Sequence, residues 1–192
     1  MSTEQALVAL PPMVILDRDG VINEDSDDYI KSVDEWIPID GSLEAITRLN
    51  HAGVLVTVAT NQSGIGRGMF DIGELNRMHA KFEQMLGRVG GHVDGIFFCP
   101  HRPDEGCSCR KPAPGLLRSI SLRLAVPLDQ VFFIGDSKRD VDAALSARAR
   151  PMLVRTGKGQ RTLGRHPELA QLPVFDHLLA AVEHILGREQ SA

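Results

Sequence analysis

The sequence predicts a doubly wound, Rossmann-like α/β fold, in which a parallel sheet is covered by helices on both faces. Short apolar runs recur along the chain, and each is nearly continuous, as in strands that are buried on both faces. Segments with helical spacing of apolar residues separate these runs, and this alternation is typical of parallel sheets with right-handed crossovers. The expected strands are residues 13–16, 54–59, 96–98, 131–134 and 152–154.

Each expected helix carries a start signal. Ser42 precedes apolar residues at helical spacing, Asp71 begins a sequence that resembles a capping box, and Pro114 fits the first turn of a third helix. A last helix is expected at about 176–186, and the residues after it are expected to fray. The Gly- and Arg-rich stretch 156–166 is expected to be a loop before that helix.

The composition predicts one soluble domain over residues 1–192, with its core at about 13–187. The chain has 21 Lys and Arg against 25 Asp and Glu, which gives a net charge of −4, and 43% of its residues are apolar. This charge and the small number of aromatic residues argue against a nucleic-acid partner. The apolar stretch 6–16 is broken by two prolines and lacks a basic start, so it is neither a signal peptide nor a membrane span. We therefore expect a cytoplasmic monomer with no membrane partner.

Polar clusters directly follow the predicted strands, at the edge of the sheet where open α/β folds bind ligands. The clusters are Asp17-Arg18-Asp19-Gly20, Thr60-Asn61-Gln62-Ser63-Gly64, Arg110-Lys111-Pro112 and Asp136-Ser137-Lys138-Arg139-Asp140. Several carboxylates suit Mg²⁺, while a lysine and a Thr hydroxyl can hold phosphoryl oxygens. Each cluster alone is common in solvated turns, but their order at successive strand ends favours phosphoryl transfer with a carboxylate nucleophile.

All three cysteines of the chain lie in one Gly- and Pro-rich segment. Cys99, His101, Cys107 and Cys109 offer three thiolates and one imidazole, which is a ligand set of closed tetrahedral Zn²⁺ sites. The alternative is three reduced cysteines beside an ordinary loop histidine, and the low apolar content of the segment disfavours it. A zinc ion there would be structural, and it would order the loop that carries Arg110 and Lys111.

Four short motifs at these strand ends resemble those of the haloacid dehalogenase (HAD) superfamily of phosphohydrolases. The motifs are Asp17-Arg18-Asp19-Gly20-Val21, Val58-Ala59-Thr60-Asn61, Lys111-Pro112 and Gly135-Asp136-Ser137 with Asp140. The resemblance implies that Asp17 attacks phosphorus to form an aspartyl-phosphate. It implies that Asp19 protonates the leaving alkoxide and then deprotonates the attacking water. Thr60 and Lys111 would hold phosphoryl oxygens.

The same resemblance implies a catalytic Mg²⁺ and a fold without a cap domain. The Asp17 carboxylate, the Asp19 backbone carbonyl and Asp136 would bind the ion, with Asp140 as an indirect or alternative ligand. The stretch between Asp19 and Thr60 has room for only one loop and one helix, so the HAD-like domain should lack a cap and the pocket should be open.

The zinc loop, together with the motifs near the start of the chain, resembles a capless subgroup of these phosphatases. This resemblance implies Mg²⁺-dependent removal of the 7-phosphate from D-glycero-D-manno-heptose 1,7-bisphosphate, a small phosphorylated sugar used to build the lipopolysaccharide core. Hydrolysis of histidinol phosphate, which is the substrate of related domains, is an alternative. Hydrolysis of polynucleotide 3′-phosphates is a further alternative, which the acidic net charge disfavours.

The substrate is expected to contact residues on the acidic loop after the first strand, on the turn after the second, and near the two basic clusters. The candidates are Asp25, Ser26, Asp27, Asp28, Asn61, Gln62, Ser63, Arg110 and Lys138. Arg110 favours a bisphosphate, because a guanidinium can bind a second anion with two hydrogen bonds. Arg67 and Lys158 are either further phosphate ligands or solvated charges, and Tyr29 and Trp36 either line the entrance or pin its loop.

Overall fold

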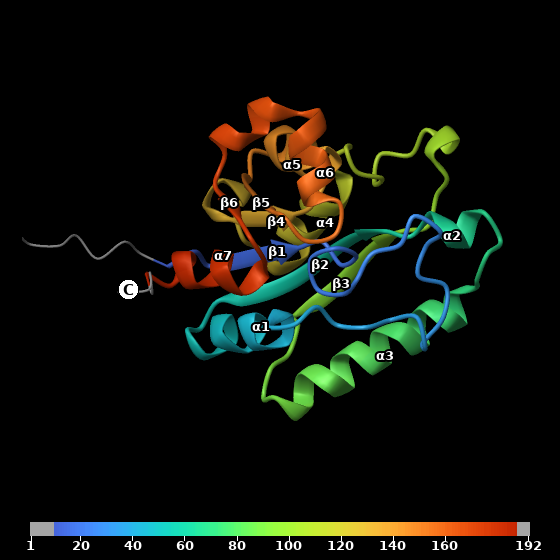
Figure 1. Cartoon of the computed structure of the whole chain (residues 1–192), viewed down its shortest axis with the longest axis horizontal. Coiled ribbons are helices and arrows are strands. Elements are labelled where there is room, and N and C mark those ends of the chain that lie inside the picture. Colours follow the sequence, from blue (N-terminus) through green and yellow to red (C-terminus); the bar gives the residue numbers. More distant parts are fainter. Residues whose placement is uncertain (1–9, 188–192) are drawn as a thin grey trace, which may run out of the picture.

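The computed structural model describes residues 10–187, which form a six-stranded parallel sheet with helices on both faces (Figure 1). The strands are β1 (Met13–Leu16), β2 (Leu55–Asn61), β3 (Gly95–Cys99), β4 (Phe132–Gly135), β5 (Arg150–Val154) and β6 (Val174–Phe175). Their order is β3-β2-β1-β4-β5-β6, and each neighbouring pair is parallel. The chain builds one half of the sheet outward from β1 and then the other half, so the predicted doubly wound fold is confirmed.

The helices connect these strands as crossovers. They are α1 (Ser42–His51), α2 (Ser63–Gly66), α3 (Ile72–Arg88), α4 (Gly115–Leu124), α5 (Lys138–Ala147), α6 (Gly159–Arg165) and α7 (Leu178–Ile185). The Asp71 carboxylate caps α3 by accepting a hydrogen bond from the Glu74 backbone N–H, as expected. Glu74 does not complete a capping box, because its own carboxylate accepts from the Val33 N–H in the loop after β1. Across residues 10–187 no helix combines the length and the apolar character needed to cross a membrane.

Two hydrophobic cores lie on the two faces of the sheet, because successive strand residues point to opposite faces. Val14 and Leu16 of β1 pack with apolar residues of α1, α3 and α7. Met13 and Ile15 of the same strand pack with apolar residues of α4 and α5. The continuous apolar run that predicted β1 therefore reflects burial on both sides, and it leaves Asp17 as the first polar residue beyond the sheet.

The prediction of a loop over residues 156–166 was wrong, because α6 forms within it. The stretch lacks apolar residues at helical spacing, and its helix is instead held by contacts with β4 and β5. The Thr162 hydroxyl donates to the Asp136 carbonyl oxygen at 2.9 Å, and a side chain at Gly159 would overlap the Val154 carbonyl. The expected fraying of the last residues concerns 188–192, which lie outside the described residues together with residues 1–9.

Candidate active site

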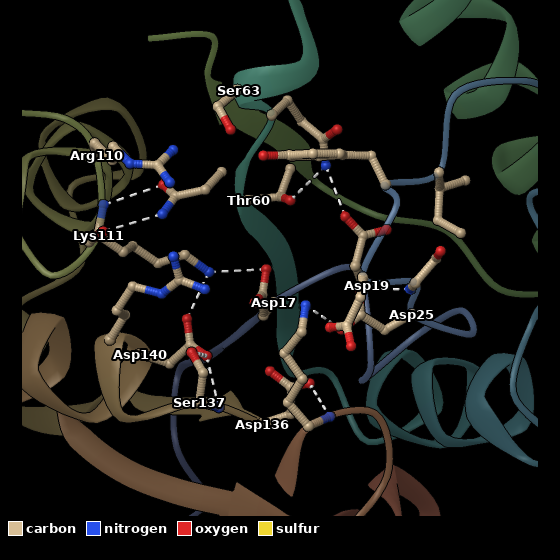
Figure 2. Close-up of a pocket in the computed structure, with 18 residues that line it drawn as sticks. Asp17, Asp19, Asp25, Thr60, Ser63, Arg110, Lys111, Asp136, Ser137 and Asp140 are labelled. Carbon is tan, nitrogen blue, oxygen red and sulfur yellow. Dashed lines mark hydrogen bonds and ion pairs between the residues drawn. The ribbon is translucent and has the colours of Figure 1, made fainter. Parts of the chain in front are cut away.

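A pocket of about 170 Å³ lies at the carboxyl ends of β1, β2 and β4, beside the point where the strand order reverses (Figure 2). The structure brings together at this pocket most of the residues that the sequence singled out. They are Asp17, Asp19, Asp25, Ser26, Asp27, Thr60, Asn61, Gln62, Ser63, Arg110, Lys111, Asp136 and Asp140. Asp28 and Lys138 do not line it.

Lys111 is a buried cation held between two carboxylates. Its Nζ lies 2.8 Å from Asp17 Oδ1 and 2.6 Å from Asp140 Oδ1, and the side chain is only 2% exposed (Figure 2). Burial lowers the pKa of Lys111, but the charges of Asp140 and Asp17 outweigh this effect and raise that pKa above its usual value. Lys111 is therefore charged at neutral pH. It is a fixed positive charge at the floor of the pocket.

Asp17, Asp136 and Asp140 form a cluster whose carboxylates suit a divalent cation. One oxygen from each lies within 4.8 Å of the others. Burial, followed by the charge of Asp140, raises the pKa of Asp136 to about 8. Burial also raises the pKa of Asp17 to about 7, although Lys111 opposes the rise. The protein's own cations thus do not neutralise this cluster, and oxygen ligands in this number fit Mg²⁺.

Asp140 belongs to this cluster, but its oxygens already have protein partners. Oδ1 pairs with Lys111, while Oδ2 accepts from the Ser137 N–H at 3.0 Å and from the Ser137 hydroxyl at 2.6 Å. These bonds also cap the first turn of α5. The geometry therefore suits Asp140 to holding Lys111, and leaves Asp17 and Asp136 as the better placed metal ligands.

The segment after β5 holds Asp136 in place. The Lys158 backbone N–H donates to Asp136 Oδ2 at 2.7 Å. Side chains at Gly20 or at Gly157 would overlap this same oxygen, and both glycines have positive φ. The close approach of these two backbones to Asp136 therefore requires glycine at both positions.

Asp19 lies on the opposite side of the pocket, among hydrogen-bond donors. Asn23 Nδ2 and Gln62 Nε2 donate to its carboxylate, each at 2.9 Å, and the Arg18 guanidinium donates to both of its oxygens. Burial raises the pKa of Asp19, but the charge of Arg18 and these hydrogen bonds outweigh it and lower the pKa below its usual value. Gln62 Nε2 also donates to Thr60 Oγ1 at 2.9 Å, which leaves the Thr60 hydroxyl hydrogen available to a ligand.

Asn61 connects the end of β2 to the loop that carries Lys111. Its Nδ2 donates to the Lys111 carbonyl oxygen, and its Oδ1 accepts from the Lys111 N–H, both at 3.0 Å. This reciprocal pair uses both ends of the Asn61 amide. Asn61 therefore fixes the Lys111 backbone, a task that the sequence did not suggest.

The three cysteines and His101 converge just beyond β3. The Sγ atoms of Cys99, Cys107 and Cys109 lie 3.2 to 3.6 Å apart, and His101 Nδ1 lies 3.5 Å from Cys99 Sγ and 3.3 Å from Cys109 Sγ. Zn–S bonds of about 2.3 Å place the thiolates of a tetrahedral site about 3.8 Å apart. The donor set and its spacing fit a structural Zn²⁺ site.

The acidic loop after β1 forms one rim of the pocket and is paired with α6 and the residue before it. Asp25 Oδ2 lies 2.6 Å from Lys158 Nζ, and the Asp27 carboxylate accepts two hydrogen bonds from Arg161. Asp28 is exposed and lies off the pocket. Asp25, Ser26 and Asp27 line the pocket and Asp28 does not, so a contact between Asp28 and the substrate stays a prediction without support from its position.

Two arginines, Arg110 and Arg139, line the opposite rim. Burial, followed by the charge of Arg139, lowers the pKa of Arg110, so the two guanidiniums are close enough to repel each other. Neighbouring Lys138 was expected at this rim, but its Nζ pairs with both Asp142 oxygens at 2.7 Å on the solvent side of α5. The two are consecutive residues of α5, and the rotation of about 100° between them turns Arg139 toward the pocket and Lys138 away.

Tyr29 and Trp36 have different roles: Tyr29 lines the pocket, and Trp36 anchors a loop. Tyr29 lines the pocket, and the Arg67 guanidinium carbon lies 5.9 Å from the centre of its ring, so Arg67 is outside the lining. Trp36 is fully buried, and its backbone carbonyl accepts from Lys81 Nζ of α3 at 2.7 Å. Trp36 thus anchors the entrance loop, which is the segment between β1 and α1, to the domain.

Comparison with known proteins shows which family has this fold and these motifs. The family model for HAD-hydrolase-like proteins matches residues 108–181. A Pseudomonas aeruginosa protein named D-glycero-beta-D-manno-heptose-1,7-bisphosphate 7-phosphatase is 53% identical over 174 residues, which cover 91% of this chain and 97% of that relative. The chain belongs to the HAD-like hydrolase family. An Escherichia coli K12 protein of the same name is 37% identical over 155 residues, which cover 77% of this chain and 81% of the relative.

Solved structures agree with this membership. The D,D-heptose 1,7-bisphosphate phosphatase from B. bronchiseptica, crystallised with magnesium and phosphate, superposes on this HAD-like hydrolase with a TM-score of 0.89 at 49% identity, covering 92% of this chain and 99% of the other. The corresponding phosphatase from Burkholderia thailandensis gives a TM-score of 0.70 at 43% identity, covering 91% and 97%. The resemblance to the HAD superfamily stated from the motifs is therefore confirmed.

The structure of this HAD-like hydrolase also brings to the pocket residues to which the sequence analysis gave no role of their own. Arg139 and Ser137 line it from the start of α5, and Ile30 lines it from the entrance loop. Arg139 follows Asp136 by three residues and lies in the first turn of α5, and this closeness in sequence was the available signal for it. Lys158, which the sequence left between two roles, also lines the pocket and supplies a backbone donor to Asp136.

Proposed function

We propose that the protein is a Mg²⁺-dependent phosphatase that removes the 7-phosphate of D-glycero-β-D-manno-heptose 1,7-bisphosphate. The observation that carries this proposal is the buried Asp17 carboxylate paired with Lys111 beside a three-carboxylate cluster. Relatives at about 50% identity, named for the β anomer of this substrate, support the choice of sugar. We also propose that it acts as a single catalytic domain and as a cytoplasmic monomer.

The phosphate to be cleaved would bind between Asp17, Lys111 and Thr60. Lys111 Nζ would pair with one phosphoryl oxygen, and the Thr60 hydroxyl would donate to another. Asp17, the Asp19 carbonyl and Asp136 would hold Mg²⁺, whose positive charge would neutralise the phosphoryl oxygens and keep the carboxylates ionised. Asp140, Asn61 and the zinc loop would hold Lys111 in position for this contact.

In the first step an Asp17 oxygen attacks phosphorus, and the bond between phosphorus and the sugar oxygen breaks. Asp17 Oδ1 accepts from the Arg18 N–H and pairs with Lys111, which leaves Oδ2 as the attacking oxygen. Asp19 gives its proton to the leaving alkoxide. A phosphate dianion beside Asp19 disfavours the ionised carboxylate, so the proton is taken up as the substrate binds.

In the second step water attacks phosphorus, and the bond to Asp17 breaks. Asp19 is now a carboxylate, and it takes the proton from the attacking water. The hydrogen bonds from Asn23 and Gln62 stabilise this ionised form between the two steps. Inorganic phosphate then leaves, and Asp17 is restored.

A phosphate-release assay with two substrates tests this proposal. We expect a higher kcat/KM for heptose 1,7-bisphosphate than for histidinol phosphate, because the pocket rim has two guanidiniums for a second anion. The α and β bisphosphates are compared in the same assay, and the β anomer should be preferred. An equal or greater kcat/KM for histidinol phosphate would reject the sugar substrate.

Arg139 should contribute to selectivity for the bisphosphate. Replacing it with Ala removes one of two guanidiniums at the rim, and we expect kcat/KM for the bisphosphate to fall about tenfold, as for loss of a charge-assisted hydrogen bond. Hydrolysis of heptose 7-phosphate, which lacks the second anion, should change little. Lys138→Ala is the matched control, because Lys138 is adjacent and equally basic but pairs with Asp142 outside the pocket. Equal losses for both substrates would contradict a role in binding the second phosphate.

A further inference from the structure

Arg18 is a buried cation among the catalytic carboxylates, and the mechanism above gives it no role of its own. Its side chain is 1% exposed, and burying a guanidinium is costly unless its donors are satisfied. Nε donates to Asp19 Oδ1 at 3.0 Å, while Nη2 donates to Oδ1 at 2.9 Å and to Oδ2 at 3.1 Å. This planar fork fixes both the position and the plane of the Asp19 carboxylate.

The remaining arm of Arg18 faces His79. Arg18 Nη1 and His79 Nε2 are 3.5 Å apart, and a guanidinium can only donate, so Nε2 must be the acceptor of a neutral imidazole. Burial, followed by the charge of Arg18, lowers the pKa of His79 from 6.5 to about 4, which agrees with a neutral ring. The tautomer with the proton on Nδ1 therefore accepts from Arg18.

His79 reaches Arg18 from an otherwise apolar helix face. The buried side chains of α3 are Leu75, Met78, His79, Phe82 and Leu86, of which His79 alone is polar. Its ring packs edge-on against Phe98 of β3, with the ring centres 6.3 Å apart. A polar group on such a face destabilises the core unless it is hydrogen-bonded, and the contact with Arg18 supplies that bond.

These contacts hold Asp19 from the side away from the substrate. Asn23 and Gln62 bind the same carboxylate, and Gln62 also contacts Thr60 at the phosphate position. No residue of α3 lines the pocket, and His79 is the residue by which this helix contacts the Arg18–Asp19 pair. Without an acceptor for Nη1, the guanidinium is free to tilt, and the Asp19 carboxylate tilts with it.

We propose that His79 and Arg18 are positioning residues, which hold the Asp19 carboxylate in the orientation that transfers a proton to the leaving sugar oxygen. The inference rests on the proposed function, because it takes Asp19 to be the acid for that step. Its consequence is specific to the leaving group. A sugar alkoxide needs a proton to depart, whereas p-nitrophenolate leaves without one.

The test compares kcat/KM for heptose bisphosphate and for p-nitrophenyl phosphate, because kcat/KM reports the steps up to departure of the leaving group. His79→Leu should lower the value for the sugar about tenfold, part of the effect of a general acid, and leave the aryl phosphate nearly unchanged. His79→Gln offers a neutral acceptor and should restore the sugar value. Arg18→Lys keeps the charge but loses the fork. It should therefore lower the ratio of kcat/KM for the sugar to kcat/KM for the aryl phosphate, and it tests the inference if His79→Leu does not fold.

Two further variants separate the possible outcomes. Leu86→Ala destabilises the same helix without touching Arg18, and it should leave the ratio of the two kcat/KM values unchanged. Asp19→Asn should lower that ratio strongly. If Asp19→Asn lowers the ratio and neither His79→Leu nor Arg18→Lys does, the positioning inference is wrong and the proposed mechanism stands. If Asp19→Asn leaves the ratio unchanged, the acid assignment fails, and the inference fails with it.

Discussion

Replacing Asp17 with Asn should lower kcat by about 10⁶-fold, which is the loss observed when a covalent nucleophile is removed. Asn has the shape of Asp17, but its amide is not a nucleophile, and it no longer pairs with Lys111 as an anion. Phosphate release from the heptose bisphosphate measures the loss. Acid quenching of the wild-type reaction should trap a phosphoenzyme that the variant does not form.

The same variant should fold, because Asp17 is costly in its ionised form. Burial raises the pKa of Asp17 from 3.8 to about 7, so the folded state prefers the neutral carboxyl group. The contribution of Asp17 to the stability of the fold therefore falls as the pH rises. Without Mg²⁺ this contribution is highest below pH 3.8, and it is lost as the pH rises through about 7. At pH 8 without Mg²⁺, Asp17→Asn should therefore unfold at a temperature no lower than wild type. Turnover close to that of wild type would contradict the nucleophile assignment.

The strand ends explain why so much of this pocket could be predicted from the sequence. Asp17 and Asp136 each directly follow the last residue of a strand, and Thr60 lies near the end of another. Carboxyl ends of parallel strands share one edge of the sheet, so an alternating pattern of strands and helices brings these residues together without knowledge of loop geometry. Cys99 follows the same rule at β3, and it begins the metal-binding loop.

The roles that the sequence did not predict depend on geometry that leaves no pattern in the sequence. Lys158 binds Asp136 through its backbone N–H, which every residue other than proline has. Arg139 and Lys138 are adjacent and equally basic, and only the rotation of α5 decides which one faces the pocket. His79 occupies a core position of an amphipathic helix, where its partner Arg18 lies 61 residues earlier in the chain.

Replacing Cys109 with Ser should remove the zinc ion and lower kcat/KM by about 10²-fold, because small displacements of positioned groups cost that much. Cys109 Sγ contacts both other thiols and His101, so its loss opens the tetrahedral set. Lys111 follows Cys109 by two residues, and its backbone would then be held mainly by Asn61. Metal analysis of protein purified without a chelator should find about one zinc ion per wild-type chain and much less in the variant.

The effect should be local, because Cys109 is only partly buried at the margin of the core beside α4 and α5, and the core on the other face contains no residue of the loop. We expect the thermal unfolding of Cys109→Ser to shift little, while a Glu-specific endoproteinase cleaves faster after Glu105, an exposed site within the loop. Ser108→Ala is the matched control, since it lies between two ligands and uses only its carbonyl oxygen, which accepts from the Gly115 N–H. Full activity in a zinc-free variant would show that Asn61 alone positions Lys111. Global unfolding of the variant would show that zinc supports the whole domain rather than this loop.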